Sequence, residues 1–276
     1  MSDIFPPLTP KIRPEQPWFV LSAAKYYSAM PSADPAISHF YNFEVAASVK
    51  HTFAIPDGCV DIVFDCDAQV PTARVCGTTL KAREVEFISG HRYFGVRFSP
   101  GVIPDFIDLD AEELTDREFS FLDAIPNARL AQEQISGTAL LSEKISLFNQ
   151  YFTYKLIRKP TTVTSISIQN IIEKKGNIRI DQLESLTGYT CRTIQRQFRQ
   201  DTGLSPKAFS RIIRCQSALN AIHEGKEMAM IDLAFDLGFS DQSHFLREFK
   251  QLVSTTPQHY QRTLTQNVYH ERIIYR

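Results

Sequence analysis

Residues 237–249 read LGFSDQSHFLREF, and a related stretch, TGYTCRTIQRQF, occupies residues 187–198. Each copy contains a glycine followed by an aromatic residue, then a hydroxyl residue and a segment that ends in Arg-x-Phe. A proline follows each copy at a matching distance, Pro206 after the first and Pro257 after the second. Two helices joined by a short glycine-containing turn form a helix-turn-helix unit. The repeat therefore predicts two such units in the C-terminal half.

The second helix of each predicted unit has one apolar and one polar face. Ile194 and Phe198 share the apolar face of the first, and Phe245, Phe249 and Leu252 that of the second. Forked or basic side chains dominate the opposite stripes: Arg192, Gln195, Arg196 and Arg199 in the first helix, and Gln242, Ser243, His244, Arg247 and Lys250 in the second. Arg and Gln match the guanine and adenine edges of the major groove. One such stripe is more simply a solvated face, but two within a repeat predict binding to double-stranded DNA.

Residues 206–223 form the predicted helix between the two units. Eighteen residues at 1.5 Å per residue give a length of about 27 Å. Successive major grooves on one side of DNA are about 34 Å apart. One chain could therefore place both second helices in adjacent major grooves and read a non-palindromic site.

The segment RKPTTVTS, residues 158–165, combines a proline with four hydroxyl residues and predicts a linker. Beyond it we expect helices over 165–175, 181–187, 191–201, 206–223, 230–237, 242–253 and 257–262. The predicted domain layout is a β-rich regulatory domain (1–110), a helical layer or dimerisation segment (111–158), a linker (159–165), a DNA-binding domain (166–265) and a C-terminal tail (266–276).

The first half is rich in short segments with β-branched and aromatic residues. They are HTFAI (51–55), CVDIVFD (59–65), EVEFIS (84–89) and RYFGVRF (92–98). In the last, Phe94, Val96 and Phe98 alternate with Tyr93, Gly95 and Arg97, which predicts one apolar and one mixed face. The fold class is therefore α+β, with an N-terminal sandwich or partial barrel. Apolar residues from Leu130 through Ile135, Leu140, Leu141, Ile145 and Phe148 to Phe152, ending near Tyr154, predict helices that pack on it or, alternatively, form a dimer interface.

Residues 162–263 resemble the DNA-binding domain of the AraC/XylS transcription regulators. GFSDQSHFLREFK is close to that family's signature, and SPKAFSRIIRCQSALNAI is similar to its linker helix. The resemblance implies seven helices, DNA and RNA polymerase as partners, a tendency to activate transcription, and base contacts on Arg192, Gln195, Arg196, Gln242, Ser243, His244 and Arg247. Three positions depart from the pattern. Ser254 and Thr256 replace the usual glycine and serine, and Glu184 stands where the second copy has Ala234.

A looser resemblance covers the N-terminal half. IPDGCVDIVFD (55–65), YFGVRFSPG (93–101) and ELTDREFSFLD (113–123) are similar to a poorly characterised domain of some AraC-type regulators. Many members of the family bind a small effector in a cupin-like domain and dimerise through helices that follow it. The HxH metal ligands of enzymatic cupins are missing, which argues against cupin catalysis. Asp61 and Arg97 are weak candidates for effector contacts, whereas Asp57 before Gly58 is ordinary turn chemistry.

Charge is distributed unevenly along the chain. Residues 1–160 carry 15 Lys and Arg against 20 Asp and Glu, and residues 161–276 carry 15 against 11, which gives −5 and +4. A mildly basic second half is compatible with a polyanionic partner. The N-terminus lacks a signal-peptide pattern, and no apolar run reaches the roughly 18 residues of a membrane span. We therefore expect a cytoplasmic protein without a membrane partner.

The sequence favours an enzyme function less than DNA binding. Ser240, Asp241 and His244 lie close together, but Ser240 is expected to cap a helix, and an exposed helix start offers no oxyanion hole. An alternative is a DNA-repair regulator with a methyl-accepting cysteine in a four-cysteine zinc site. Cys59, Cys66 and Cys76 have the wrong spacing for that site, and five cysteines without a CxxC pair indicate reduced thiols. A thiol- or metal-responsive sensor is the remaining alternative; we expect no enzyme activity, cofactor or metal.

Overall fold

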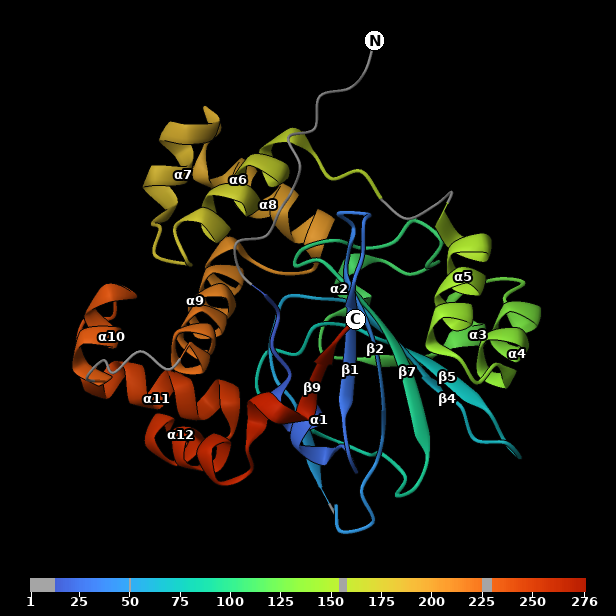
Figure 1. The fold of residues 1–276 in the computed structure, drawn as a ribbon. Coiled ribbons are helices and arrows are strands. Elements are labelled where there is room, and N and C mark those ends of the chain that lie inside the picture. The colour runs from blue at the N-terminus through green and yellow to red at the C-terminus, as the bar shows by residue number, and fades with distance from the viewer. Residues whose placement is uncertain (1–12, 50, 154–157, 225–229) are drawn as a thin grey trace.

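The computed structural model describes residues 13–49, 51–153, 158–224 and 230–276. A seven-stranded sheet forms the centre of the N-terminal half (Figure 1), with the order β8-β5-β4-β7-β2-β1-β9. Its strands are β1 (Tyr27–Pro31), β2 (Ile37–Glu44), β4 (Asp61–Asp65), β5 (Thr72–Cys76), β7 (Arg92–Phe98), β8 (Glu118–Ser120) and β9 (Ile273–Tyr275). Neighbouring strands are antiparallel except β1 and β9. A separate two-stranded sheet pairs β3 (Thr52–Ala54) with β6 (Arg83–Val85).

The four predicted strand segments are all present, and β7 has the predicted bounds. Its alternation is also confirmed, because Phe94, Val96 and Phe98 enter one core while Tyr93 enters another. The other face is buried as well as mixed, since Arg97 is only 2% exposed. Both faces of the central strand are thus covered, one by the helical layer and the other by parts of the C-terminal half.

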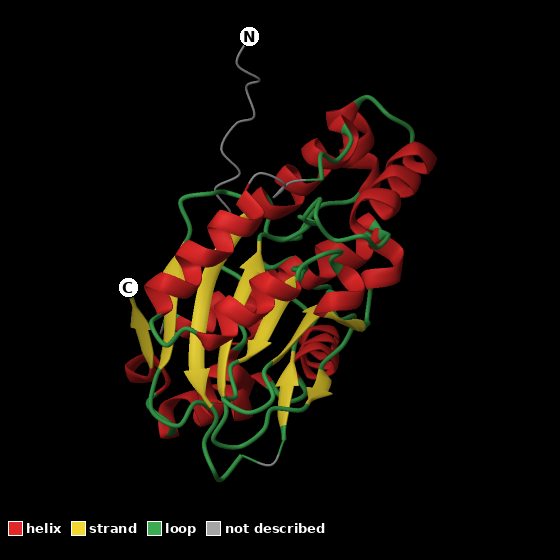
Figure 2. Ribbon diagram, turned by 90° about the vertical axis from the view of Figure 1, so that its right-hand side faces the viewer, coloured by secondary structure: helices red, strands yellow, loops and turns green. Residues whose placement is uncertain are grey.

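The helical layer comprises α3 (Phe121–Ala124), α4 (Arg129–Gly137) and α5 (Leu141–Phe152). In Figure 2 helices of this layer cross in front of the strands. Ile135, Phe148 and Phe152 are buried in the core beneath it. The expectation that Leu130 and Leu140 share this apolar face is wrong, because they are 56% and 59% exposed. The break between α4 and α5 interrupts the helical period on which that expectation depended. Tyr154 lies outside the described residues.

The first half also contains α1 (Pro17–Ser22) and α2 (Ala111–Leu114). Strand β8 falls within residues 111–158, which were predicted to be helical, and it pairs with β5. That segment is therefore part helix and part sheet. Three residues are too few to show a clear strand period, and edge pairing of this kind depends on residues far away in the chain.

Seven helices follow in the described part of the second half. They are α6 (Thr162–Glu173), α7 (Ile180–Thr187), α8 (Cys191–Thr202), α9 (Pro206–His223), α10 (Met230–Asp236), α11 (Gln242–Val253) and α12 (Pro257–Gln266). The bounds of α9 and α11 are those predicted. The linker expected over 159–165 is too long, because α6 already begins at Thr162 and buries Thr164 completely. The hydroxyl-rich composition predicts a loop here, but the hydroxyl groups are used at the start of the helix. Ser165 donates to the carbonyl of the N-cap residue Thr161, and the Thr161 hydroxyl donates to Thr164.

The helix-turn-helix units have different cores. The first unit, α6 to α8 with the start of α9, encloses a core made only of residues 163–213. Among the described residues, the second unit, α10 to α12, has no such separate core. Its residues Phe245, Phe249 and Tyr260 belong to a cluster that includes Phe19, Tyr41 and Phe43 of the first half. After α12, a 3-10 turn at Tyr269–Arg272 leads into β9, which lies beside β1 (Figure 1). No helix in the described ranges combines the length and apolarity needed to span a bilayer.

Candidate nucleic-acid interface

The polar stripe of α8 is exposed as the sequence predicts. Arg192, Gln195, Arg196 and Arg199 all face solvent, whereas Ile194 and Phe198 are completely buried. Thr190 caps the helix by accepting a hydrogen bond from the Thr193 N–H. The preceding helix ends at Gly188 in the left-handed conformation, which produces the short turn between the two helices.

Glu184, one of the departures from the family pattern, takes part in this turn. Its carboxylate accepts a hydrogen bond from the backbone N–H of Cys191, the first residue of α8. A carboxylate near a helix N-terminus is favourable because it satisfies a free N–H group and complements the helix dipole. Ser254 also has an explanation, since it ends α11 in the left-handed conformation with φ 68°. Gly203 fills the equivalent place after α8.

The polar stripe of α11 is also accessible. Gln242, Ser243, Arg247 and Lys250 are exposed, and His244 is half-buried. The expectation that Ser240 caps this helix is wrong. Asp241 is the cap, and its carboxylate accepts the His244 N–H at 2.7 Å. This bond, together with one from the Ser240 hydroxyl, lowers the pKa of Asp241. The second copy of the repeat has one residue more than the first, since its glycine and final phenylalanine are 11 positions apart (Gly238 to Phe249) against 10 (Gly188 to Phe198). This extra residue lies in the turn and places a carboxylate instead of a hydroxyl at the helix start.

Ser240, Asp241 and His244 do meet, but with the wrong connectivity for a hydrolase. The Ser240 hydroxyl lies 3.2 Å from His244 Nδ1 and donates to Asp241 Oδ2 at 3.1 Å. Asp241 binds the backbone N–H of His244 and not its imidazole. In a catalytic triad the acid orients the histidine ring through the nitrogen opposite the serine. The three side chains therefore form a capped helix start.

The first unit contacts the N-terminal half through the end of α8. Arg199 Nε lies 3.1 Å from Glu112 Oε2 of α2, with both side chains more than half exposed. Gly203 abuts the same helix so closely that a Cβ atom there would lie 2.2 Å from the Ala111 carbonyl oxygen. One residue of the predicted DNA-binding stripe is thus held by the N-terminal half in this conformation.

Helix α9 makes polar contacts with the loop that contains residues 56–59, the PDGC residues. Gln216, which is completely buried, donates to the Pro56 carbonyl at 2.8 Å and accepts the Glu15 N–H at 2.8 Å. The ring of Phe209 also packs against Gly58, so that a Cβ atom at Gly58 would lie only 3.0 Å from the ring carbon Cε2. Gly58 has a φ of +78°, in the left-handed region. The motif that carries the N-terminal resemblance therefore lies against the helix that joins the two units. The sequence contained no signal for this contact.

The two weak effector candidates, Asp61 and Arg97, form a buried ion pair. Arg97 also lies 3.4 Å from Asp57, and Tyr41 donates to Asp61 at 2.8 Å. Burial raises the pKa of Asp61 to about 6, although Arg97 opposes that shift. The cavity beside the pair has a volume of about 40 Å³, close to the ~30 Å³ that one water occupies. Their burial is accounted for by mutual pairing, and effector contact stays a prediction.

The cysteines do not form a cluster of ligands. Within the described ranges, no group of three or more His, Cys, Asp or Glu side chains could hold a metal ion. Burial raises the pKa of the Cys59, Cys66 and Cys76 thiols above the ordinary value, and that of Cys215 to about 12. Because the thiolate is the nucleophile, these thiols are poorly activated for accepting a methyl group.

Two family models match this chain. One, described as a helix-turn-helix domain, covers residues 184–263. The other, described as a domain of unknown function (DUF6597), covers residues 27–120. The second model includes the PDGC residues and most of the sheet.

Known proteins resemble the C-terminal part. The probable transcription factor PqrA of Proteus vulgaris is 31% identical over 90 residues, which are 33% of this chain and 73% of PqrA. The uncharacterized HTH-type transcriptional regulator YbfI of Bacillus subtilis is 32% identical over 106 residues, and this chain spans only 38% of its length. A crystal structure of a probable AraC family transcriptional regulator from Rhodopseudomonas palustris is 27% identical and covers 37% of this chain and 97% of its own, with a TM-score of 0.33. By its helix-turn-helix domain and its similarity to PqrA, the chain belongs to the AraC family of DNA-binding transcription regulators.

Proposed function

We propose that the chain regulates transcription by placing α8 and α11 in adjacent major grooves of one DNA site. The observation that carries this proposal is the pair of exposed polar stripes, one on each second helix, joined by the 18-residue α9. Arg and Gln of these stripes contact base edges, while further Lys and Arg side chains and the helix N-termini bind phosphates.

We propose further that the N-terminal half controls this binding. The contacts of Gln216 and Phe209 with the PDGC loop, and of Arg199 with Glu112, support such control because they join the two halves along α9 and at the end of α8. A small-molecule effector, RNA polymerase and a second copy of the chain are the proposed partners. The five-part domain layout is proposed with its linker shortened to the residues before Thr162.

No catalytic step is assigned to the chain. Ser240, Asp241 and His244 at the start of α11 lack the hydrogen bond that would orient the imidazole, and the buried thiols are weakly nucleophilic. The methyl-acceptor alternative is therefore disfavoured. A methyl-transfer assay with alkylated DNA tests it, because transfer of the methyl group to any cysteine would contradict the assignment.

The DNA-binding proposal is tested by selecting bound sequences from a random library and then comparing variants. We expect Arg196→Ala or Arg247→Ala to weaken binding to the selected site by about 1 to 3 kcal/mol and to relax base preference at one position. Arg129→Ala, at an exposed arginine of α4, serves as the control for loss of charge. Equal loss on every DNA sequence would show that these arginines contact phosphates only.

A further inference from the structure

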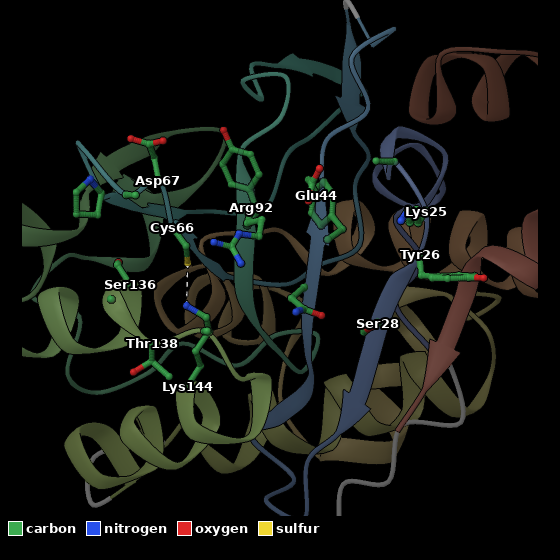
Figure 3. Close-up of a pocket in the computed structure, with 18 of the residues that line it drawn as sticks. Lys25, Tyr26, Ser28, Glu44, Cys66, Asp67, Arg92, Ser136, Thr138 and Lys144 are labelled. Atoms are coloured by element: carbon green, nitrogen blue, oxygen red, sulfur yellow. Dashed lines mark hydrogen bonds between the residues drawn. The ribbon is translucent and has the colours of Figure 1, made fainter.

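A second, much larger cavity of about 650 Å³ lies at the edge of the helical layer (Figure 3). The strand register explains why it exists. Asn42 pairs with Phe94 on one side and with Ser28 on the other, and Ser28 pairs with Ile274 of β9. Paired residues of neighbouring strands point to the same face. The face that α4 and α5 cover is therefore apolar at Phe94 and becomes polar toward β1, where the cavity opens.

A buried lysine forms one wall. Lys144 of α5 is 4% exposed, and its ammonium donates to the Ile135 carbonyl at 2.8 Å and to Cys66 Sγ at 3.1 Å. The second of these bonds is drawn in Figure 3. An ammonium has three donors, so one is left. Among the described residues, no carboxylate lies within 4.0 Å of Lys144 Nζ. A buried cation without a counter-ion is unfavourable, and an anion in the cavity would compensate it.

Ser136 provides an independent observation on the same wall. It is 6% exposed, lines the cavity near the end of α4, and its hydroxyl has no hydrogen-bond partner in the described structure. Buried hydroxyl groups nearly always have a partner. In Figure 3, Ser136 and Lys144 lie on the helical side of the cavity. A hydroxyl donor and an ammonium on one wall suit a carboxylate head group.

The opposite wall comes from the strands. Arg92 begins β7, Lys25 precedes β1 and Arg276 follows β9, and all three line the cavity. Glu44, Asp67 and Glu133 line it as well, so the side chains of the lining carry a net charge of +1, and the buried charge, that of Lys144, is positive. Asp67 is already engaged, since it accepts two backbone N–H groups of its own loop. The volume lies within the ~300–1,000 Å³ of small-molecule pockets and far exceeds that of an inorganic ion.

We propose that this cavity binds a small polar organic acid, whose carboxylate accepts hydrogen bonds from Lys144 Nζ and Ser136 Oγ. Arg276 belongs to the segment that follows the DNA-binding units, so the bound acid contacts both halves of the chain. Occupancy then favours the docked position of β9 on β1. This inference deepens the proposed effector control and names the chemistry of the effector.

Binding is tested on the full chain without DNA, so that its outcome is separate from that of the DNA-binding proposal. Citrate, glucuronate and 4-hydroxybenzoate are added at about 10 mM, with glucose and 4-hydroxybenzamide as neutral counterparts. A ligand that binds only the folded state raises Tm, and we expect a rise of about 2 °C or more with at least one acid and with neither neutral compound. Shifts below about 1 °C with all three acids would overturn the proposal.

Variants locate the site. Lys144→Met is expected to abolish the acid-dependent shift and to raise Tm without ligand, because it removes a buried unpaired charge. Lys81→Met, at an exposed lysine, is the matched control and should retain the shift. Ser136→Ala preserves the fold more conservatively and should weaken acid binding about fivefold. An unchanged shift in both Lys144→Met and Ser136→Ala would place the acid elsewhere and refute this site.

The contribution of β9 has its own readout. The acid that gives the largest shift should slow hydrogen exchange at Ile273–Tyr275 several-fold in the wild type, and less in Arg276→Gln. Equal exchange with and without the acid would contradict the contact with β9.

Discussion

The two helix-turn-helix units have similar sequences but are attached to the β-domain in different ways. The first encloses its own core, from Val163 to Ile213, and touches the N-terminal half through close approaches at Gly58, Gly101 and Gly203 and through an exposed ion pair. The second contributes Phe245, Phe249 and Tyr260 to a core that it shares with the sheet. A direct hydrogen bond also joins the second unit to the N-terminal half, because the indole N–H of Trp18 in α1 donates to the Val253 carbonyl at 3.0 Å.

This difference indicates which unit can move. Separating the second unit from the sheet would expose large aromatic side chains to water, with a free-energy cost of roughly 25 cal/mol per Å² of apolar surface exposed. Separating the first unit breaks an exposed ion pair and the contacts of Phe209 and Ile168 with Gly58 and Gly101, while the rest of its core stays enclosed. We infer that regulation adjusts the position of α8 relative to a fixed α11.

The strongest test of this inference removes one core aromatic residue from each unit. Phe198→Ala and Phe249→Ala should each cost about 3–5 kcal/mol of local stability. Phe198→Ala should increase hydrogen exchange within residues 162–213 only, because that core is separate. Phe249→Ala should increase exchange in α11 and also in α1 and β1, which share its core.

Leu130→Ala is the control for these variants, since Leu130 is 56% exposed and its loss should change stability by less than about 0.5 kcal/mol. If Phe198→Ala loosened the sheet as much as Phe249→Ala, the two units would be equally coupled and the inference would be wrong.

The sequence predicted the repeat, both polar stripes and the bounds of α9 and α11, because capping residues and helical spacing are local signals. It did not predict the attachment of the units. Gln216 lies on a helix whose spacing says nothing about the PDGC loop that it contacts. Strand β9 has three residues and finds its partner, β1, more than two hundred positions away. The sequence favoured Ser240 as the cap of α11, whereas Asp241 is the cap, because a serine and an aspartate are equally good caps and only the geometry of the longer turn selects one.

The contact between α8 and α2 can be probed with two glycines of the same conformation. Gly203 and Gly188 have φ +76° and +73°, but only Gly203 faces a neighbour, whereas a Cβ at Gly188 would meet nothing within 4 Å. Replacement by alanine should cost about 1–2 kcal/mol at either position because of the left-handed backbone. Gly203→Ala should cost more in chemical denaturation and should raise hydrogen exchange in α2. An equal loss in the two variants would show that α8 and α2 are not held tightly together.

The smallest expected effect on stability comes from Glu112→Gln. Its ion pair with Arg199 is more than half exposed, and such pairs typically contribute about 0.2–1 kcal/mol. DNA binding should change more visibly, because Arg199 would be free to contact a phosphate. We expect affinity for the selected site to rise about two- to fivefold at low salt and the gain to shrink as salt is added. Glu143→Gln removes the same charge from an exposed position of α5. An equal gain in that variant would assign the effect to overall charge and would remove Glu112 as a restraint on α8.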